Sequence, residues 1–391
     1  MTIGILGGGQ LGYMLALAGY PLGLHFRFLD PSPEAPVGRI ATRITANFDD
    51  RAALTKFASG LELVTYEFEN VPVEAARFLA QRVPVLPPPS ALEAAQDRLI
   101  EKRLFQKLDI LTTEFAAVAT RDALDRAIEK IGMPAVLKTC RMGYDGKGQW
   151  ILRSSEDVAR VKSELPAEES GSSQETQSAA HILERFVPFS RELSILAVRG
   201  RSGETAFYPL VENHHRGGIL RLSLAPAQRL DTILQRSAED AARRIFDTLQ
   251  YVGVLAIEFF EHEGRLLANE MAPRVHNSGH WTIEGAVTSQ FENHLRAVMG
   301  LPLGVTSAQG CSAMLNLIGD VPDSSDVLGI RDAHLHLYGK SARIGRKLGH
   351  ITLRAGSSEQ LASRLAELPG FFHRPDFCLD AAFARPASSR A

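Results

Sequence analysis

The chain has 391 residues, with 43 Lys and Arg against 45 Asp and Glu, so its formal net charge is −2. That balance argues against a protein that binds nucleic acid through bulk electrostatics, although it leaves room for a local basic pocket. At roughly 100–200 residues per domain, the length predicts two to four domains.

Cysteine usage and the apolar runs point to the cytoplasm. The spacing of Cys140, Cys311 and Cys378 fits neither a disulfide framework nor a zinc site, so we expect free thiols. The N-terminus lacks a basic region typical of a signal peptide. No apolar run approaches the roughly 18 residues that a membrane span needs. We therefore expect a cytoplasmic protein with no nucleic-acid or membrane partner.

The first hundred residues alternate strand and helix patterns. Strands are predicted over 2–6, 24–30 and 61–69, and helices over 11–19 and 50–58. This alternation predicts a doubly wound α/β domain that ends near the prolines at 87–89. A further helix is expected to begin at Ser90, with Glu93 at the capping-box spacing.

A glycine-rich loop joins the first strand to the first helix. Residues 7–12, GGGQLG, satisfy G-x-G-x-x-G, a pattern that lets a phosphate approach a helix N-terminus. Asp30 ends the next strand, where an acid suits a ribose hydroxyl. The pattern is weak, and a tight turn without a ligand explains it as well.

From Pro134 onward the pattern becomes rich in short strands, as in an antiparallel sheet. Later elements are a helix over 237–249, a strand pair at 254–260 and 266–270, and a smaller region from about residue 310. The polar segment 163–180 reads as a surface loop, and the tail 384–391 as disordered. The earlier strands are predicted over 135–139, 149–153, 181–187, 191–198 and 206–213, and the smaller region holds strands over 312–318, 333–339 and 349–355 and a helix over 358–366.

Lys138 lies on an apolar strand, where an unpaired ammonium would be costly to bury, so it needs a partner or a ligand. The loop 143–149, GYDGKGQ, follows it with three glycines and a lysine, and such a loop can close over nucleotide phosphates. Glu184 ends a later strand, where a carboxylate and the adjacent backbone suit adenine and ribose. Glu192 enters another strand and is also compatible with a surface position.

The strand pair VLAIEFFEHEGRLLANE is expected to bring two carboxylates and an amide together on one side of a sheet. If the turn at 262–265 closes symmetrically, Glu258 lies opposite Asn269 and Glu270 is one residue further on. Hard oxygen ligands of this kind suit magnesium that bridges nucleotide phosphates. A purely structural explanation needs nearby cations to balance the two charges.

A polar loop, PRVHNSGHWT, follows at residues 273–282. Its histidines His276 and His280 are four apart, but the Asn-Ser-Gly between them indicates a loop, so we reject a zinc helix. Arg274 is positioned to neutralise a transferring phosphoryl group. Lys340 and the run 345–350, GRKLGH, form a dense basic cluster that suits a distal substrate phosphate or a solvated turn.

Together these motifs resemble the N5-carboxyaminoimidazole ribonucleotide synthase family of the ATP-grasp superfamily, in order and over almost the whole chain. The specific motifs are GYDGKGQ and APRVHNSGHWT. The resemblance implies an α/β and α+β fold with three domains: a doubly wound pre-ATP-grasp domain (1–100), an ATP-grasp domain (101–305) and a small β-rich C-terminal domain (306–391). It also implies a homodimer, with magnesium as cofactor and ATP, bicarbonate and 5-aminoimidazole ribonucleotide as substrates.

The same resemblance assigns site residues motif by motif. ATP is expected at Arg98, Lys138, Gly143, Tyr144, Asp145, Gly146, Lys147, Gly148, Gln149, Glu184, Arg185, Phe186, Val187, Glu192, His215, Asn269 and Glu270. The ribonucleotide is expected at Gln10, Leu11, Glu67, Glu69, His276, Asn277, Lys340, Arg346 and Lys347, with the choice between Glu67 and Glu69 open. Magnesium is expected on Glu258 and Glu270, and catalytic roles on Arg274, His276, Tyr144 and Asp145.

The expected reaction makes bicarbonate electrophilic through carboxyphosphate, with His276 as a candidate proton acceptor. Three rivals remain open from the residues alone. One is another ATP-grasp ligase, such as formate-dependent glycinamide ribonucleotide transformylase or biotin carboxylase. The others are a nicotinamide-dependent oxidoreductase that uses the glycine loop with Asp30, and a non-catalytic nucleotide-binding protein.

Overall fold

The computed structural model describes residues 1–143, 147–166, 180–372, 374, 377 and 379. Several predicted features fall outside these residues: Tyr144, Asp145 and Gly146 of the glycine-lysine loop, positions 167–179 of the polar segment, Cys378 and the tail 384–391.

The N-terminal region is a parallel sheet of strand order β3–β2–β1–β4, which confirms the doubly wound α/β prediction. One face packs against α1 and α10, and the opposite face packs against α2 and α3. The glycine loop leaves β1 at its carboxyl end, which is the ligand edge of such sheets. The bounds are β1 (Thr2–Leu6), β2 (His25–Asp30), β3 (Thr42–Thr45), β4 (Leu63–Tyr66), α1 (Gln10–Gly19), α2 (Arg51–Ala58), α3 (Val73–Ala80) and α10 (Gln290–Met299), with short turns η1 (Tyr20–Leu22) and η2 (Pro36–Arg39).

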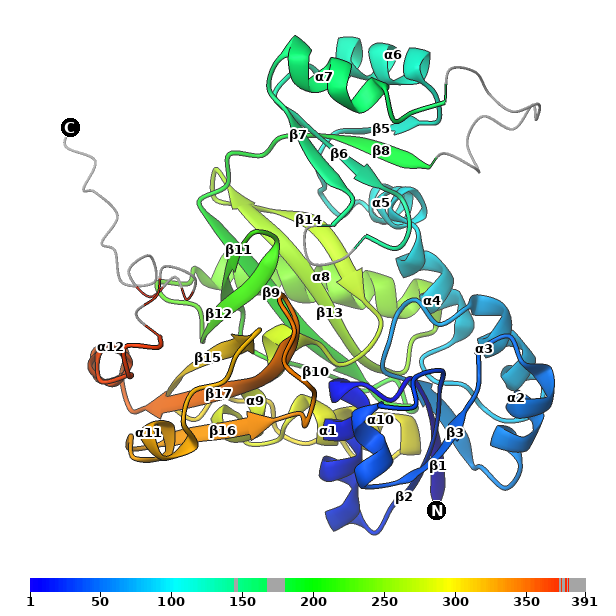
Figure 1. Ribbon diagram of the computed structural model, residues 1–391, viewed down its shortest axis with the longest axis vertical. Helices are drawn as coiled ribbons and strands as arrows, with labels where there is room; N and C mark the ends of the chain where they lie inside the picture. The colour runs from blue at the N-terminus through cyan, green and yellow to red at the C-terminus, as the bar shows by residue number, and fades with distance from the viewer. Residues whose placement is uncertain (144–146, 167–179, 373, 375–376, 378, 380–391) are drawn as a thin grey trace.

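Two consecutive helices, α4 (Pro89–Gln96) and α5 (Arg98–Lys107), lead from this sheet towards a smaller one (Figure 1). The prediction that Ser90 caps a helix is wrong. Pro88 is the N-cap and Pro89 fills the first helical position, where its fixed φ is already suited to the helix. Glu93 does not form the expected capping box and pairs with Arg77 at 2.7 Å.

The smaller sheet has the antiparallel order β5–β8–β6–β7 and is covered on one side by α6 and α7, at the top of Figure 1. Its apolar core contains Val118, Leu124, Leu137 and Leu183. The bounds are β5 (Phe115–Val118), β6 (Ala135–Thr139), β7 (Gln149–Leu152), β8 (His181–Arg185), α6 (Arg121–Ile131) and α7 (Ser155–Lys162).

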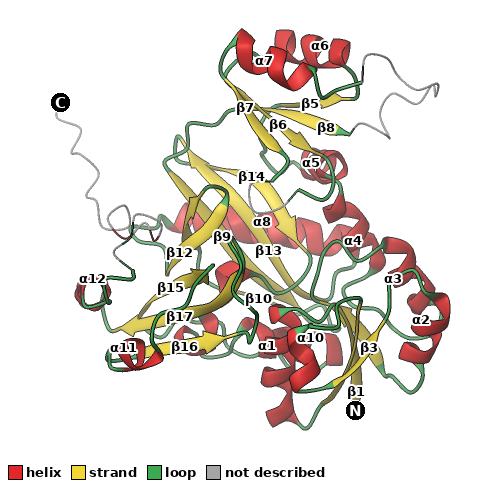
Figure 2. Ribbon diagram, in the orientation of Figure 1, coloured by secondary structure: helices red, strands yellow, loops and turns green. Residues whose placement is uncertain are grey.

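A large sheet of order β14–β13–β9–β11–β12–β15–β17–β16 forms the centre of the molecule, with β10 paired to β9 (Figure 2). The predicted strand-rich stretch therefore divides between two sheets. Helix α8 packs on the large sheet and starts five residues earlier than predicted, at Thr232, because Asp231 caps it. The bounds are β9 (Arg191–Arg199), β10 (Thr205–Phe207), β11 (Val211–Arg216), β12 (Ile219–Ala225), β13 (Gly253–His262), β14 (Arg265–Ala272), β15 (Cys311–Ile318), β16 (Ala333–Leu337), β17 (Lys347–Ala355) and α8 (Thr232–Leu249).

The predicted strand over 206–213 is two strands, β10 and β11, because the segment Tyr208-Pro209-Leu210 interrupts it and a proline cannot donate to the ladder. The C-terminal strands continue the large sheet through the β12–β15 pair. They are covered by α11 (Ser324–Leu328) and α12 (Ser358–Ala366), while η3 (Asn277–Gly279) and α9 (Thr282–Gly285) lie between β14 and α10.

Two further sequence expectations bear on the described residues. Cys140 and Cys311 are free cysteines, as predicted. Within the described part of the chain, no helix has the length and apolar character needed to cross a bilayer.

Asp97 is the helix cap that separates α4 from α5, and its carboxylate accepts from the backbone N–H groups of Leu99 (3.0 Å) and Ile100 (3.4 Å). We predict that Asp97→Ala lowers the free energy of unfolding by about 1 kcal/mol, because two N-terminal amides lose their acceptor. Urea unfolding measures this. Asp97→Asn, which keeps a capping oxygen, should stay near wild type, and equal losses in both variants would contradict the capping role.

Candidate functional site

A cleft lies between the three sheets and receives residues from each of them. It encloses about 360 Å³, within the range of small-molecule sites. Among the predicted site residues, those that line it are Gln10, Leu11, Glu67, Glu69, Arg98, Gly143, His215, Glu258, Glu270, Arg274, His276, Asn277 and Lys347.

Glu258 on β13 and Glu270 on β14 are direct cross-strand partners. The predicted pairing of Glu258 with Asn269 is wrong by one residue. A β-bulge between Glu258 and Phe259 shifts the register, so that Phe259 pairs with Ala268 and Asn269 is the extra residue. Bulges redirect side chains in this way beside active sites. As a result, the two carboxylates face each other across the hairpin.

The two facing carboxylates have opposite pKa shifts. Burial and the neighbouring Glu270 charge raise the pKa of Glu258 to about 7. Burial also opposes ionisation of Glu270, but Arg98, 2.7 Å away, outweighs it and holds the pKa of Glu270 at about 2. Glu258 therefore lacks a full counter-charge. A buried carboxylate in that state, beside an ionised one, fits a site for a divalent cation.

Lys138 on β6 has the partner that its burial requires. Its Nζ donates to Glu184 on β8 at 2.8 Å and to Asn269 on β14 at 3.4 Å. Arg98 makes a similar bridge, since it binds Glu270 and also lies 3.5 Å from the carbonyl oxygen of Gly143. These contacts join the small sheet to the hairpin that carries the acid pair.

Two buried residues of α5, Glu101 and Lys102, also belong to this cluster, and sequence reasoning missed them. Glu101 accepts from the backbone N–H of Met271 at 2.6 Å, and Lys102 donates to the carbonyl oxygen of Ala268 at 3.0 Å. They hold β14 on either side of the bulge. Burial raises the pKa of Glu101 to about 8 and lowers that of Lys102 to about 8.

The glycine loop is occupied by acids of the same domain. Asp30 accepts from the backbone N–H of Gly8 at 2.6 Å, and Glu67 accepts from Gly9 at 2.8 Å and Gly12 at 3.2 Å. A side chain at Gly9 would press on the Glu67 carboxylate. Because these amides already serve carboxylates, the loop is a wall of the cleft, and Asp30 does not face a ribose of a nicotinamide cofactor.

Glu67 and Glu69 both line the cleft, but their partners differ. Burial raises the pKa of Glu67 despite its two backbone hydrogen bonds. Burial also opposes ionisation of Glu69, but an ion pair with Arg274 holds the pKa of Glu69 below its usual range.

His215 on β11 pairs with Glu192 on β9, with 2.9 Å between Nδ1 and Oε2. Burial would lower the pKa of His215, but the hydrogen bond and charge of Glu192 outweigh it and raise this pKa to about 8. The His215 ring is therefore protonated near neutral pH, next to the Glu192 carboxylate.

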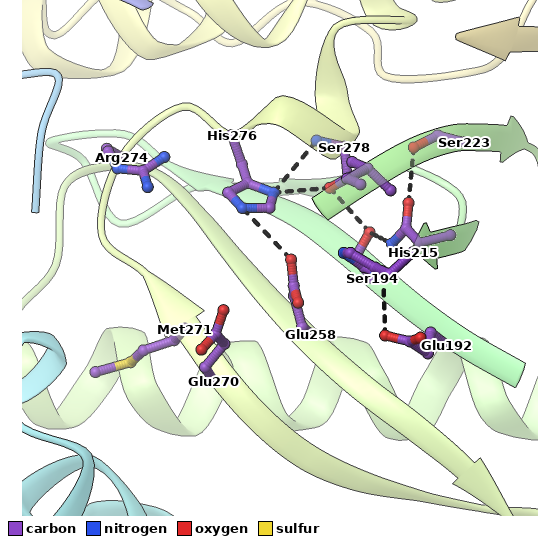
Figure 3. Close-up of polar contacts among 12 residues, drawn as sticks. Glu192, Ser194, His215, Ser223, Glu258, Glu270, Met271, Arg274, His276 and Ser278 are labelled. Carbon is purple, nitrogen blue, oxygen red and sulfur yellow. Dashed lines mark hydrogen bonds and ion pairs between the residues drawn. The ribbon is translucent and has the colours of Figure 1, made fainter. Parts of the chain in front are cut away.

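The loop after β14 presents His276 and Arg274 to the cleft (Figure 3), and Asn277 of the same loop also lines it. Burial and the nearby Arg274 charge lower the pKa of His276 to about 3, so its ring is neutral. The amide oxygen and nitrogen of Asn277 are buried without a hydrogen-bond partner among the described residues, which suits a ligand contact. His280 points elsewhere, stacking on Phe291, and no group of three metal-ligating side chains occurs in the described ranges.

The basic cluster is only partly directed at the cleft. Lys347 lines it, and Lys340 hydrogen-bonds to Gln10 of the glycine loop. Arg346 instead donates to the Ser341 hydroxyl at 2.8 Å. The C-terminal region therefore contacts the N-terminal domain at the edge of the cleft.

The remaining nucleotide-site predictions concern the ends of β7 and β8. Arg185 pairs with Glu114 at 2.7 Å on the surface, and the backbone N–H of Phe186 donates to Pro134. Val187 follows in the chain, and Lys147, Gly148 and Gln149 lead into β7.

Comparisons with known proteins extend over this whole arrangement. Three family models match: a ribonucleotide synthetase preATP-grasp domain (residues 1–96), an ATP-grasp domain (103–291) and a phosphoribosylaminoimidazole carboxylase C-terminal domain (312–364). The chain is 53% identical to N5-carboxyaminoimidazole ribonucleotide synthase of Pseudomonas aeruginosa, over 94% of this chain and 98% of that protein.

Solved structures give the same result. The crystal structure of N5-carboxyaminoimidazole ribonucleotide synthetase from Thermus thermophilus is 58% identical, with a TM-score of 0.86 over 94% of this chain and 97% of that one. The enzyme from Aspergillus clavatus in complex with ADP and 5-aminoimidazole ribonucleotide is 30% identical, with a TM-score of 0.86 over 95% and 98% of the two chains.

We predict that Glu192→Gln lowers the pKa of His215 from about 8 to below its usual value near 6.5, because burial then acts without the opposing carboxylate. The interaction of protonated His215 with Glu192 stabilises the folded state. This contribution to the free energy of unfolding is fully present below pH 6.5 and is lost as the pH rises through 8. NMR titration of the His215 ring measures the shift. Glu212→Gln, next to His214 on the same strand, is the control, and an unchanged His215 pKa in Glu192→Gln would contradict the pairing.

Proposed function

The chain belongs to the N5-carboxyaminoimidazole ribonucleotide synthase family of ATP-grasp ligases, and from this premise we propose how its cleft performs the reaction. It is an ATP-dependent carbon–nitrogen ligase that carboxylates 5-aminoimidazole ribonucleotide in purine biosynthesis. The proposal is that bicarbonate supplies the carboxylate and is activated by ATP as carboxyphosphate.

The observation that carries the proposal is the pair Glu258 and Glu270, facing each other on the large sheet with Lys138 and Arg98 opposite them on other elements. Two acids and two cations at one edge of a cleft suit the phosphates of ATP with a divalent metal. The residues we assign to the nucleotide by motif lie on this side.

The ribonucleotide fits the other side of the cleft. Its walls there are the glycine loop with Gln10, the buried amide of Asn277, and Lys347, and Lys340 contacts Gln10 at the edge. The lysines suit the phosphate of the ribonucleotide, and Asn277 has free hydrogen-bonding atoms for a polar group. The amine would then face the site of phosphoryl transfer.

The chemistry proceeds in two balanced steps. A bicarbonate oxygen attacks the γ-phosphorus of ATP, the bond to the β-phosphate oxygen breaks, and ADP leaves. The amine nitrogen then attacks the carbonyl carbon of carboxyphosphate, phosphate leaves, and the amine loses one proton. Lys138 and Arg274 stabilise the negative charge that develops, and the 143–149 loop is proposed to exclude water.

The residues Glu258 and Glu270 fit magnesium, since their oxygens are hard ligands and Glu258 lacks a full counter-charge. A bound magnesium ion would neutralise phosphate oxygens of ATP. Glu258 and Glu270 would hold the ion from the large sheet, and Asn269 on the same hairpin would lie next to it.

Three organisational features complete the proposal. The domains are taken as 1–100, 101–305 and 306–391. The enzyme is proposed to act in the cytoplasm and as a homodimer, as the family resemblance implies. Exposed apolar side chains on α1 and η1, Leu17, Tyr20 and Leu22, suit a subunit contact.

The proposal is tested by phosphate release from ATP, with and without bicarbonate and 5-aminoimidazole ribonucleotide. We expect release that depends on both, and incorporation of labelled bicarbonate into the ribonucleotide. Phosphate release that is indifferent to both additions would falsify the substrate assignment.

We predict that Glu270→Gln lowers the turnover of ATP by about 100-fold or more while leaving the fold intact, because a metal ligand and the partner of Arg98 are lost together. Coupled ADP assays with circular dichroism measure this. The control is Glu263→Gln in the exposed turn of the same hairpin. Near-wild-type activity in Glu270→Gln would contradict the assignment of Glu270 as a magnesium ligand.

We predict that Arg346→Ala raises the KM for the ribonucleotide about tenfold with little change in kcat, because a positive charge next to Lys347 is lost together with the hydrogen bond to Ser341 that holds this loop. Steady-state kinetics at saturating ATP measure it. Arg343→Ala, exposed in the same loop, should leave this KM unchanged. An unaltered KM in Arg346→Ala counts against a role in binding the substrate phosphate.

A further inference from the structure

A chain of buried hydrogen bonds runs beneath the cleft to the histidine of the loop after β14 (Figure 3). Ser223 donates to the Asn213 amide oxygen at 2.7 Å, and the Asn213 NH₂ group donates to Ser194 at 2.8 Å. The Ser194 hydroxyl donates to Ser278 Oγ at 2.9 Å, and this oxygen lies 2.9 Å from His276 Nδ1. We call Ser223, Asn213, Ser194 and Ser278 the serine–asparagine chain.

The strand register places the side chains of the serine–asparagine chain on the face of the large sheet that carries Glu258 and Glu270. Ser194 on β9 is the direct partner of Glu258 on β13, so their side chains project from the same face. Asn213 on β11 is the partner of Ser223 on β12, and it lies two residues beyond Val211, the partner of Ser194. Because side chains two apart share a face, all four strands contribute to one polar row.

Ser278, at the end of the serine–asparagine chain next to His276, determines which ring nitrogen of His276 carries the hydrogen. The backbone N–H of Ser278 donates to His276 Nδ1 at 3.3 Å, since His276 caps the turn η3. A backbone N–H can only donate, so Nδ1 must offer a lone pair, and a neutral imidazole then has its hydrogen on Nε2. Nε2 lies 3.4 Å from Glu258 Oε1, so the ring nitrogen that carries the hydrogen is the one next to this carboxylate.

Burying the polar side chains of the serine–asparagine chain costs free energy of folding. The relative exposure of its members is 0% for each serine and 4% for Asn213, so each polar atom needs a partner. Apolar side chains would fill the same space without that requirement. The connection to a carboxylate in the cleft supplies a reason for the polar residues.

We propose that the serine–asparagine chain consists of positioning residues that lock His276 in its Nε2–H form, so that it orients the Glu258 carboxylate. The inference rests on the proposed function, in which Glu258 holds the magnesium of ATP. It also replaces the expectation that His276 accepts a proton, because Nδ1 already accepts from the backbone N–H of Ser278 and Nε2 carries the ring hydrogen. Hydrogen-bonding partners of metal-binding side chains typically fix their orientation in this way.

The tautomer is tested without turnover, by ring-nitrogen NMR of the full-length protein labelled with ¹⁵N-histidine. The His276 signals are assigned from their absence in His276→Gln. We expect one unprotonated nitrogen, Nδ1, and one protonated nitrogen, Nε2. In Ser278→Ala the two ring shifts should move towards each other, because the ring keeps only the long backbone contact.

Steady-state kinetics test whether the fixed tautomer of His276 is needed for turnover. We expect Ser278→Ala to lower kcat about 10-fold and to raise the magnesium concentration for half-maximal activity, with the KM for the ribonucleotide unchanged. Ser223→Ala, at the end of the serine–asparagine chain away from His276, should lower kcat and raise this magnesium concentration by smaller factors. It replaces Ser278→Ala in the test if that variant does not fold. The matched control is Ser312→Ala: Ser312 is fully buried on β15, and its hydroxyl has no partner within the described ranges.

Three results would overturn the proposal: a proton on Nδ1 in the wild-type protein, ring shifts and kcat that stay at wild-type values in Ser278→Ala and Ser223→Ala, or ring shifts that change while kcat does not. A failure of the proposed function looks different. In that case the wild-type enzyme would release no substrate-dependent phosphate, whereas the NMR result would stand independently.

Discussion

The β-bulge next to Glu258 is the constraint on which the rest of the site depends. Without the extra residue, strand alternation would place Glu258 opposite Asn269 and turn Glu270 to the other face. The bulge allows Asn269 to reach Lys138 while Glu270 faces Glu258 and binds Arg98. Because β14 is at the edge of the large sheet, its outer backbone groups have no further strand of that sheet to pair with. Helix α5 satisfies these groups through Glu101 and Lys102, so the helix keeps the irregular strand in place.

Charge balance explains why three separate regions of the chain must meet at this strand. Glu184 and Glu101 are buried acids and Glu270 is partly buried, and each has a cation or a backbone N–H within hydrogen-bonding distance. The cations come from α5 and from β6 of the small sheet. Because a buried ion without its partner is costly, the position of the small sheet over the cleft is coupled to the acid pair.

Local patterns in the sequence predicted what local physics determines. The strands Thr2–Leu6 and Ala135–Thr139 and the helix Ser358–Ala366 have the predicted bounds, since burial and capping act over a few residues. The pairing of Glu258 could not be predicted, because a symmetric hairpin and a bulged one have the same sequence spacing. Lys102 did leave a signal: it stands midway between Leu99 and Phe105 on the apolar face of α5, where the helical period calls for an apolar residue. A charged residue at such a position indicates a buried ion pair.

The glycine loop shows why a motif needs its surroundings before it indicates a ligand. Its pattern is that of a phosphate cradle, yet the amides of Gly8 and Gly9 are taken by Asp30 and Glu67. A phosphate there would have to displace two carboxylates and would meet their repulsion. The same carboxylates make the loop rigid, and Gln10, which follows it, binds Lys340 from the C-terminal region. The acids that exclude a phosphate from the loop therefore help to hold the opposite ends of the chain together around the substrate side of the cleft.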